Sequence, residues 1–348
     1  MNKTINTIHF DITYFCNYHC EYCYQGLEKQ QTHISDIVYE NFFKFLENVK
    51  DKYTVHLIGG EPFLYPRFYE MCERIVKMGH NVSTTTNFSL PKNMLAKFLN
   101  IAKGHISFWE ISIHLTQIKD MQEFYDKLVW FRNESGLVND DFQLNCVLTE
   151  DNFEQVKILK QEVNKRGFKL NIQRIFNEQD YCVYSDEIEN WLKQHKCIDI
   201  PLSMVKSDEH CKVCGKACRA GNKFFKILID GTVTRCFTNQ EYGYSLLGDM
   251  STGSKVKILK DYTPCLSLDN KCRCYLGFNK LGQITNKNCK IKYLLSTLHS
   301  KIIYKSLFFK YWYYKILKNF TPKAFRENLK KKQKYYFDKY QHPNVYGY

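Results

Sequence analysis

Three cysteines stand close together near the N-terminus, at positions 16, 20 and 23. Their spacing is C-x-x-x-C-x-x-C, and they follow a short apolar run, residues 8–12, which is typical of a strand. A tetrahedral zinc site needs four ligands, usually supplied as two C-x-x-C pairs. A lone triplet is typical of a [4Fe–4S] cluster that leaves one iron open to a small molecule. We therefore predict that Cys16, Cys20 and Cys23 bind such a cluster.

A second group of eight cysteines lies between positions 211 and 289. Its sharpest pattern is C-x12-G-x4-C, which runs from Cys218 through Gly231 to Cys236. Residues 224–229 and 232–235 read as a hairpin, because Asp-Gly is a favoured turn between two apolar strands. A strand pair with a cysteine near either end can hold two cluster ligands. The count of eight permits two further four-ligand clusters without requiring them.

The chain holds fifteen cysteines and has no apolar signal-peptide core at its start. Structural disulfides are rare in a reducing cytosol, so we expect a cytoplasmic protein whose cysteines serve metal or redox chemistry. A zinc knuckle built from Cys211, Cys214 and a later pair is the alternative for the second group. Four cysteines stand alone and are predicted to be buried, unreactive thiols: Cys72, Cys146, Cys182 and Cys197.

The elements that must position the triplet alternate between strands and helices over residues 7–174. The predicted strands are residues 8–12, 55–58, 81–86, 106–115, 142–148 and 170–174. Helices are predicted after Ser35, from Pro66 to Gly79, over 93–102 and 121–132, from a capping box at Asn152 and Gln155 to Gly167, and over 180–195. Strands spaced by helices form a parallel sheet. A curved, partly closed (βα)6 barrel and an open doubly wound sheet both satisfy the pattern, and both place sites at the carboxyl ends of strands.

The triplet, with the aromatic Tyr22 before its last cysteine, resembles the radical S-adenosylmethionine (SAM) enzymes. The resemblance implies a partial (βα)6 TIM-like barrel over residues 1–175. Gly59-Gly60-Glu61-Pro62 looks like the family's glycine-rich loop, which meets the amino group of SAM, and glycine lets backbone approach a ligand closely.

Further SAM contacts implied by the resemblance are weaker matches. Thr86 and Asn87 are similar to the family's Thr-Asn-Gly stretch, although Phe88 replaces the glycine. Ser112 and His114 occupy positions that contact the SAM carboxylate or ribose, and Asn145 reaches the ribose or methionyl part. The alternative for each is an ordinary hydrogen-bonded residue at a strand end.

The resemblance also implies a mechanism. SAM chelates the open iron, one electron from a donor such as flavodoxin or ferredoxin cleaves it, and a 5′-deoxyadenosyl radical takes a hydrogen atom from the substrate. The substrate is not readable from the sequence: a small molecule, a carbohydrate or a peptide all fit. Neither is the residue that quenches or deprotonates the substrate radical.

After a helical linker over 176–210, residues 211–290 resemble the SPASM and twitch auxiliary-cluster domains. A full SPASM domain would continue C-x2-C-x5-C-x3-C, whereas here Cys265 is followed by Cys272-Arg273-Cys274. That departure favours a shortened, twitch-like domain with one auxiliary cluster. Its expected ligands are Cys218, Cys236, one or both of Cys272 and Cys274, and either Cys265 or Cys214.

The chain has 348 residues, 44% of them apolar and 25% charged, which is a globular composition without a membrane-spanning run. Its net charge is +14, and residues 291–348 hold 13 Lys and Arg with two acidic residues. This basic, aromatic tail is interpreted either as a helical extension of the barrel or as an amphipathic helix at the anionic inner face of the membrane. Single-stranded nucleic acid is a less favoured partner. A cysteine-rich zinc protein that binds nucleic acid through the tail is the competing function.

Overall fold

A computed structural model of the chain describes residues 6–23, 32–177, 180–195, 197–198, 202, 217–236, 246–259, 263–264 and 313. The chain divides into two compact units. One unit comprises Asn6–Ser207 with Leu228–Asp230, and the other comprises Met1–Ile5, Asp208–Ile227 and Gly231–Tyr348. The cysteine triplet and every predicted SAM contact belong to the first unit.

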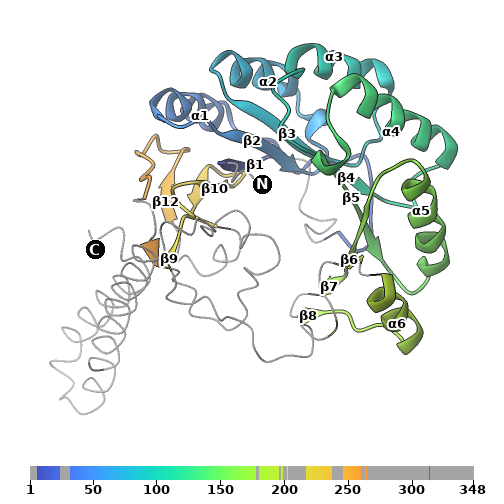
Figure 1. Cartoon of the computed structure of the whole chain (residues 1–348). Helices are drawn as coiled ribbons and strands as arrows, with labels where there is room; N and C mark the ends of the chain where they lie inside the picture. The colour runs from blue at the N-terminus through green and yellow to red at the C-terminus, as the bar shows by residue number, and fades with distance from the viewer. Residues whose placement is uncertain are drawn as a thin grey trace, which may run out of the picture. The chain divides into compact units, whose positions relative to one another are not determined.

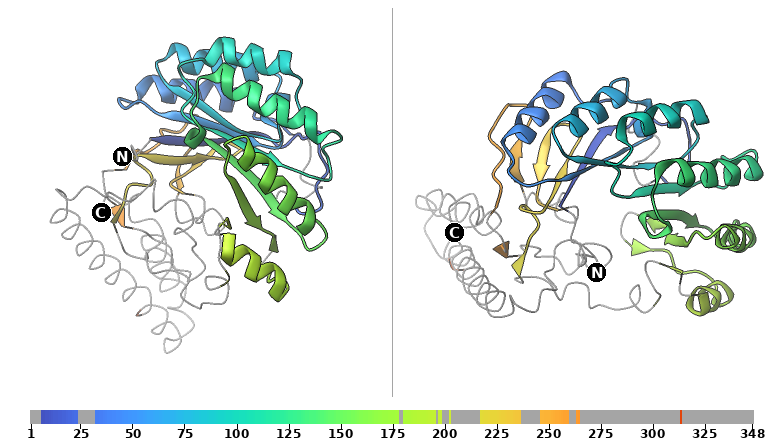
Figure 2. Two further views of the ribbon diagram at one scale, coloured as in Figure 1. Left: turned by 45° about the vertical axis from the view of Figure 1, so that its right-hand side comes forward. Right: turned by 45° about the horizontal axis from the view of Figure 1, so that its top comes forward.

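Six parallel strands form the sheet of the first unit, and their spatial order follows the sequence order. They are β1 (Thr7–Thr13), β2 (Thr54–Gly59), β3 (Asn81–Thr86), β4 (Trp109–Ile113), β5 (Phe142–Leu148) and β6 (Leu170–Arg174). A doubly wound sheet reverses its strand order at a switch point and carries helices on both faces. Here the order never reverses, and α1 to α5 all lie on one side of the curved sheet (Figures 1 and 2). The prediction of a partial (βα)6 barrel is confirmed, and the doubly wound alternative is wrong.

The helices of this unit follow the strands in turn. They are α1 (Asp36–Asn48), η1 (Pro62–Leu64), α2 (Phe68–Lys77), α3 (Lys92–Ala102), α4 (Met121–Ser135), η2 (Asn139–Asp141), α5 (Phe153–Lys165) and α6 (Asp186–His195). Their apolar faces cover the outer side of the sheet, where Phe10 of β1 packs on Phe42 of α1 with ring centroids 4.7 Å apart. Trp109 of β4 lies between Phe98 and Phe131, 5.0 and 4.6 Å from their centroids.

The opposite, inner face of the sheet is polar. Strand side chains alternate between the two faces, and paired residues of parallel neighbours share a face. The register pairs His9 with His56, Thr85 with Glu110, Ser112 with Asn145, and Asn145 with Asn171. Parallel strands that are covered by apolar layers on both faces read as continuous apolar runs. The alternation in this chain therefore marks an inner face built for polar contacts.

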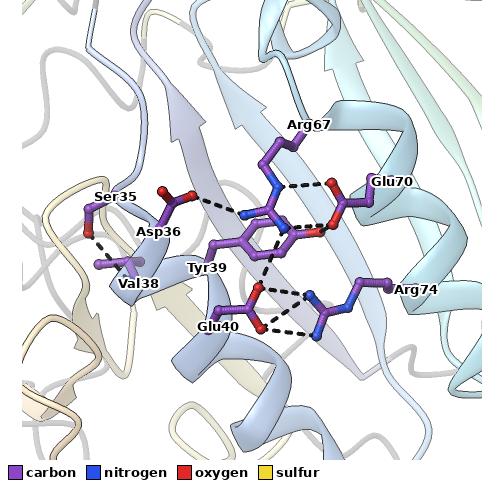
Figure 3. A network of polar contacts seen from close by, with 8 residues as sticks. All are labelled: Ser35, Asp36, Val38, Tyr39, Glu40, Arg67, Glu70 and Arg74. Atoms are coloured by element: carbon purple, nitrogen blue, oxygen red, sulfur yellow. Dashed lines mark hydrogen bonds and ion pairs between the residues drawn. The ribbon is translucent and has the colours of Figure 1, made fainter.

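An ion-pair network joins α1 to α2 on the outer surface (Figure 3). The Arg67 guanidinium lies 2.6 Å from the Glu70 carboxylate and 3.0 Å from Asp36, and its carbon is 3.5 Å from the Tyr39 ring centroid. Arg74 pairs with Glu40 at 3.1 Å. Exposed pairs of this kind each contribute about 0.2–1 kcal/mol. Ser35 caps α1 as predicted, accepting a hydrogen bond from the Val38 backbone N–H.

Several predicted boundaries move in the structure. Helix α2 begins at Phe68 with Arg67 as its N-cap residue, so Pro66 precedes the helix, and Pro62 instead begins the short helix η1. Strand β4 spans only Trp109–Ile113, since Ile106 makes an isolated bridge to Val82 rather than joining the ladder.

The capping box predicted before α5 is not formed. The Asn152 side chain accepts from the Thr149 backbone N–H at 2.9 Å and donates to the Val147 carbonyl at 3.0 Å. It thereby closes the turn after β5 and makes no cap bond to the helix. Helix α6 starts at Asp186, because Asp180–Tyr181 pairs as β8 with β7 (Phe176–Asn177).

The second unit contains the predicted hairpin. Strands β10 (Phe224–Ile227) and β11 (Thr232–Thr234) pair antiparallel, and Gly231 at the turn has φ +93°, a conformation that favours glycine. A third strand, β12 (Leu246–Asp249), extends the hairpin beyond the prediction. Strand β9 (Ala217–Cys218) pairs with β13 (Thr263–Pro264). The basic tail lies outside the described residues except for Tyr313, and no helix in the described ranges is long and apolar enough to cross a membrane.

Candidate functional site

The cysteine triplet occupies the loop after β1, at the carboxyl end of the strand. Cys20 is buried, Cys16 is half-buried and Cys23 is exposed, and none of the three forms a disulfide. The Cys23 backbone N–H donates to the Cys20 carbonyl at 3.0 Å, which turns the chain between them. Across the described ranges, no three His, Cys, Asp or Glu side chains converge as they would on one metal ion. A four-iron cluster differs from a single ion, because each cysteine binds a different iron.

The Gly-Gly-Glu-Pro loop after β2 lies directly against the cysteine loop. The Gly60 backbone N–H donates to the Thr13 carbonyl at 2.7 Å, and the Glu61 N–H donates to the Phe15 carbonyl at 2.8 Å. A Cβ on Gly59, which has φ +139°, would lie 1.9 Å from the Thr13 carbonyl oxygen. A Cβ on Gly60 would lie 2.2 Å from the Phe15 carbonyl oxygen. Only glycine fits at either position, because both contacts are with backbone.

The Glu61 side chain points into the protein and is 0% exposed. Its carboxylate accepts hydrogen bonds from the Thr86 hydroxyl at 2.9 and 3.0 Å and from the Asn87 backbone N–H at 2.7 Å. Burial raises the pKa of Glu61 to about 7, against the lowering effect of these hydrogen bonds. The Glu61 carboxylate and the Thr86 hydroxyl thus join the loops after β2 and β3.

The Asn87 side chain reaches back to the cysteine loop. Its amide nitrogen lies 3.7 Å from the Cys16 sulfur and donates to the Asn17 side-chain oxygen at 2.9 Å. The Asn87 side-chain oxygen accepts from the Ser89 backbone N–H at 3.0 Å. All its polar atoms are therefore engaged within the two loops.

His114, just after β4, meets the other end of the triplet. Its Nδ1 lies 3.3 Å from the Cys20 sulfur and 3.1 Å from the Tyr22 hydroxyl, and the Tyr22 ring stacks on it with centroids 5.9 Å apart. Burial lowers the pKa of His114 to about 4, so the imidazole is neutral at physiological pH. The structure thus brings Tyr22 and His114 together beside Cys20.

Two thiols of the triplet, Cys16 and Cys20, have raised pKa values and need a metal to ionise. Burial raises the pKa of Cys20 to about 11, helped by the neighbouring Cys16 and Cys23. Burial also raises the pKa of Cys16, opposed by hydrogen bonds from the Tyr18 backbone and from Asn87. Both thiols hold their protons at neutral pH without metal. Cluster binding must release those protons, since only thiolates ligate iron.

Ser112 and Asn145 lie side by side on the inner face, paired across β4 and β5. Asn145 is 4% exposed, and its side-chain oxygen accepts from Gln143 at 3.1 Å and from Asn171 at 2.8 Å. Gln143 and Asn171 were not predicted as site residues. The signal that could have found them is their position on the same face of adjacent strands, two residues or one strand away from Asn145.

A second polar network that the sequence did not reveal lies deeper on the inner face. His56 is 1% exposed, with Nδ1 2.7 Å from the Ser83 hydroxyl and Nε2 2.9 Å from the Thr85 hydroxyl. The Thr85 hydroxyl in turn donates to the Glu110 carboxylate at 2.8 Å. The network crosses β2, β3 and β4, so only the register of these strands assembles it.

The structure describes two of the eight cysteines in the second group. Cys236 follows β11 and is half-buried, and Cys218 ends β9. The other members lie outside the described residues: Cys211, Cys214, Cys265, Cys272, Cys274 and Cys289. The auxiliary cluster therefore stays a prediction.

The solitary cysteines are largely as predicted. Cys72, Cys146 and Cys197 are at most 8% exposed, and burial raises the pKa of each thiol, to about 12 for Cys146. Cys182 differs, since it is only half-buried beside the β7–β8 turn.

Comparison with known proteins gives one family match. Residues 10–127 match the Radical SAM superfamily. An S-adenosylmethionine-dependent nucleotide dehydratase of Selenomonas ruminantium is 28% identical over 210 residues, which cover 54% of this chain and 75% of that protein. A tungsten-containing aldehyde ferredoxin oxidoreductase cofactor-modifying protein of Pyrococcus furiosus is 25% identical over 164 residues, 43% of this chain and 45% of that one.

Two solved structures are similar to the chain at lower identity. SuiB of Streptococcus suis bound to S-adenosylmethionine is 15% identical with a TM-score of 0.48, covering 71% of this chain and 64% of that one. Native anSMEcpe with bound AdoMet and a Cp18Cys peptide is 17% identical with a TM-score of 0.49, covering 82% and 85%.

Proposed function

We propose that Cys16, Cys20 and Cys23 hold a [4Fe–4S] cluster for the reductive cleavage of SAM. The chain belongs to the Radical SAM superfamily, which its residues 10–127 match. The observation that carries the proposal is the donor set: three cysteines in one strand-end loop, which the glycine loop and Asn87 hold in place. This set fits a cluster with three cysteine ligands and one open iron. When bound, the reduced cluster and SAM supply a 5′-deoxyadenosyl radical that takes a hydrogen atom from the substrate.

The residues around the triplet then orient SAM. Gly59 and Gly60 hold the loop after β2 directly against the cysteine loop, because a Cβ at either position would meet the Thr13 or Phe15 carbonyl oxygen. Ser112, His114 and Asn145 present polar atoms on the inner side of the sheet for the carboxylate, the ribose and the methionyl part. Tyr22 shields Cys20 and contacts His114. Glu61 and Thr86 support the site indirectly, because the hydrogen bond between their side chains joins the loops that carry these contacts.

The substrate is proposed to bind along the polar inner face of β1 to β6. Hydrogen-bonding groups there, such as Asn171 and Gln143, suit a polar small molecule, a carbohydrate or a peptide backbone. A nucleotide is a second candidate, favoured by the dehydratase relative that is 28% identical over 75% of its own length. Substrates are told apart by adding each to the reduced enzyme: the correct one raises 5′-deoxyadenosine formation above the rate with SAM alone and gives a changed product.

Replacing all three cysteines with alanine tests the proposal. The triple variant should bind about four fewer irons per chain and form no 5′-deoxyadenosine when reduced with dithionite without oxygen. Cys182→Ala, a half-buried cysteine away from the triplet, is the matched control and should behave as the wild type. A triple variant that still makes 5′-deoxyadenosine refutes the proposed function.

The auxiliary cluster is proposed separately, on the C-x12-G-x4-C pattern and the hairpin between Cys218 and Cys236. The same triple variant should stay brown and keep roughly four to eight irons. A colourless triple variant that binds zinc would support the knuckle instead. The family match leaves the competing zinc and nucleic-acid function without support.

The basic tail is proposed to attach the enzyme to an anionic surface, because 13 of the 50 Lys and Arg residues lie in residues 291–348 with only two acidic residues. Basic residues near such a surface each contribute about 1 kcal/mol, screened by salt. A chain ending at Lys290 should still cleave SAM but no longer sediment with phosphatidylserine vesicles at low salt. If the full-length protein does not sediment with such vesicles, the proposed attachment is wrong.

A further inference from the structure

The Asn87 side chain is placed to act on the proposed cluster without binding SAM. It is 5% exposed, and the two N–H groups of its amide have two acceptors, the Cys16 sulfur at 3.7 Å and the Asn17 oxygen at 2.9 Å. An amide carries two donors, so both are spent on the cysteine loop. The Tyr18 backbone N–H points at the same sulfur from 3.4 Å. Cys16 thus receives hydrogen bonds from two sides.

The backbone that carries Asn87 is held in an uncommon conformation. Phe88 has φ +57°, the left-handed region that residues with a side chain rarely adopt, and it is the one such non-glycine residue in the described ranges. Its ring is 1% exposed and packs edge-on against Phe124 and Phe131, with centroids 6.0 and 5.7 Å away. The buried ring compensates for the unfavourable backbone, which turns the chain sharply after Asn87.

A buried lysine fixes the same turn from α4. The Lys127 side chain is 9% exposed, and its ammonium donates to the Leu90 carbonyl at 3.1 Å. The ammonium also lies 5.1 Å from the Phe88 ring centroid, within the range of a cation–π contact. Burying a charge is costly, and the hydrogen bond to the Leu90 carbonyl and the contact with the Phe88 ring offset part of that cost.

We infer that Asn87 raises the reduction potential of the cluster on Cys16 through its N–H···S hydrogen bond, and that Phe88 and Lys127 are positioning residues for that bond. The inference rests on the proposed function, since it needs a cluster on Cys16. It assigns Asn87 to the cysteine sulfur, with Asn17 as the second anchor of the same amide.

The physical reason is the charge that reduction adds. A cluster that takes up one electron places more negative charge on its sulfurs, so a donor aimed at a sulfur is bound more strongly in the reduced state. Asn87 is nearly excluded from water, which leaves this interaction weakly screened. Loss of the bond should therefore make the cluster harder to reduce.

The test compares anaerobically reconstituted full-length variants by redox titration followed with electron paramagnetic resonance. The signal of the Cys16 cluster is the part that disappears when Cys16, Cys20 and Cys23 are replaced with alanine. Asn87→Leu keeps the approximate size of the side chain and removes both donors. It should lower the fraction of reduced cluster at a fixed potential about tenfold, equivalent to about 59 mV for a one-electron couple.

Three further variants separate the sulfur bond from general loosening. Lys127→Met should shift the potential in the same direction by a smaller amount. Asn17→Ala removes the other anchor but leaves the donor to Cys16, so its shift should be smaller than that of Asn87→Leu. Asn100→Leu makes the same replacement at an exposed position of α3 and should leave the potential unchanged.

A cluster with normal iron content and an unchanged potential in Asn87→Leu overturns the inference while the proposed function stands. An equal shift in Asn17→Ala also overturns it, because anchoring of the loop would then explain the effect. If Asn87→Leu takes up no iron, Asn87→Ser and Lys127→Met decide by the same criteria. A wild type without the Cys16-dependent signal sinks the proposed function, and this inference with it.

Discussion

The left-handed backbone at Phe88 makes a prediction about stability that runs against the usual order of substitutions. In most positions, and above all in helices, alanine is more stable than glycine, since glycine gains more backbone freedom on unfolding. At a positive φ the order reverses, because a Cβ clashes with the backbone. Phe88, with φ +57°, should follow the reversed order.

The magnitudes follow from the contacts. Removing the buried Phe88 ring costs about 3–5 kcal/mol in either variant, because a cavity opens beside Phe124 and Phe131. Glycine relieves about 1–2 kcal/mol of left-handed strain that alanine retains. Glycine also gives the unfolded chain more conformational freedom than alanine does, which reduces this advantage by roughly 0.4–1 kcal/mol. Phe88→Gly should therefore be more stable than Phe88→Ala by about 1 kcal/mol.

The assay is thermal unfolding of the purified variants under one set of conditions. A difference of 1 kcal/mol corresponds to roughly 2–4 °C for a domain of 150–250 residues. Phe131, on helix α4 in the same ring cluster, provides the matched control. In a helical backbone alanine is more stable than glycine, so Phe131→Gly should have a lower melting temperature than Phe131→Ala. If position 88 shows the same order as position 131, the backbone at Phe88 is not held left-handed and the reasoning fails.

Two other predictions concern the loops that hold the cysteines. Gly60→Ala places a Cβ 2.2 Å from the Phe15 carbonyl oxygen and should separate the two loops at a cost of about 1–3 kcal/mol or more, so most cluster iron should be lost. Gly79→Ala is the control: its φ of +82° adds left-handed strain, but its Cβ meets no atom within 4 Å, so it should keep its iron. Iron retention in Gly60→Ala would contradict the argument. Burial raises the pKa of Glu61 from 4.5 to about 7, so the folded state binds the Glu61 proton more tightly than the unfolded state does. The contribution of Glu61 to the free energy of unfolding is therefore full at low pH. It falls by about 3 kcal/mol as the pH rises from about 4.5 to about 7. Glu61→Gln should lack this pH dependence in thermal melts of the metal-free protein, while the exposed Glu73→Gln should keep it; parallel curves for Glu61→Gln and the wild type would refute the assignment.

The sequence by itself determined the features that are local along the chain. The spacing of Cys16, Cys20 and Cys23 is a property of one loop, and it pointed to the family that residues 10–127 match. Strands β3, β5 and β6 coincide with the predicted residues 81–86, 142–148 and 170–174, because apolar periodicity reports whether a segment is buried. The hairpin at Gly231 was predictable because its turn is encoded by two adjacent residues.

The tertiary structure alone decided which side chains meet. Cys20 and His114 are 94 positions apart, and Cys16 and Asn87 are 71 apart. The parallel register brings them together, and a one-residue slip in that register would turn every side chain of a strand to the other face. For the same reason the sequence could not show that the Glu61 carboxylate faces inward to Thr86, or that His56, Thr85 and Glu110 share one network. Periodicity shows that a residue is buried, whereas its partner depends on how neighbouring strands are aligned.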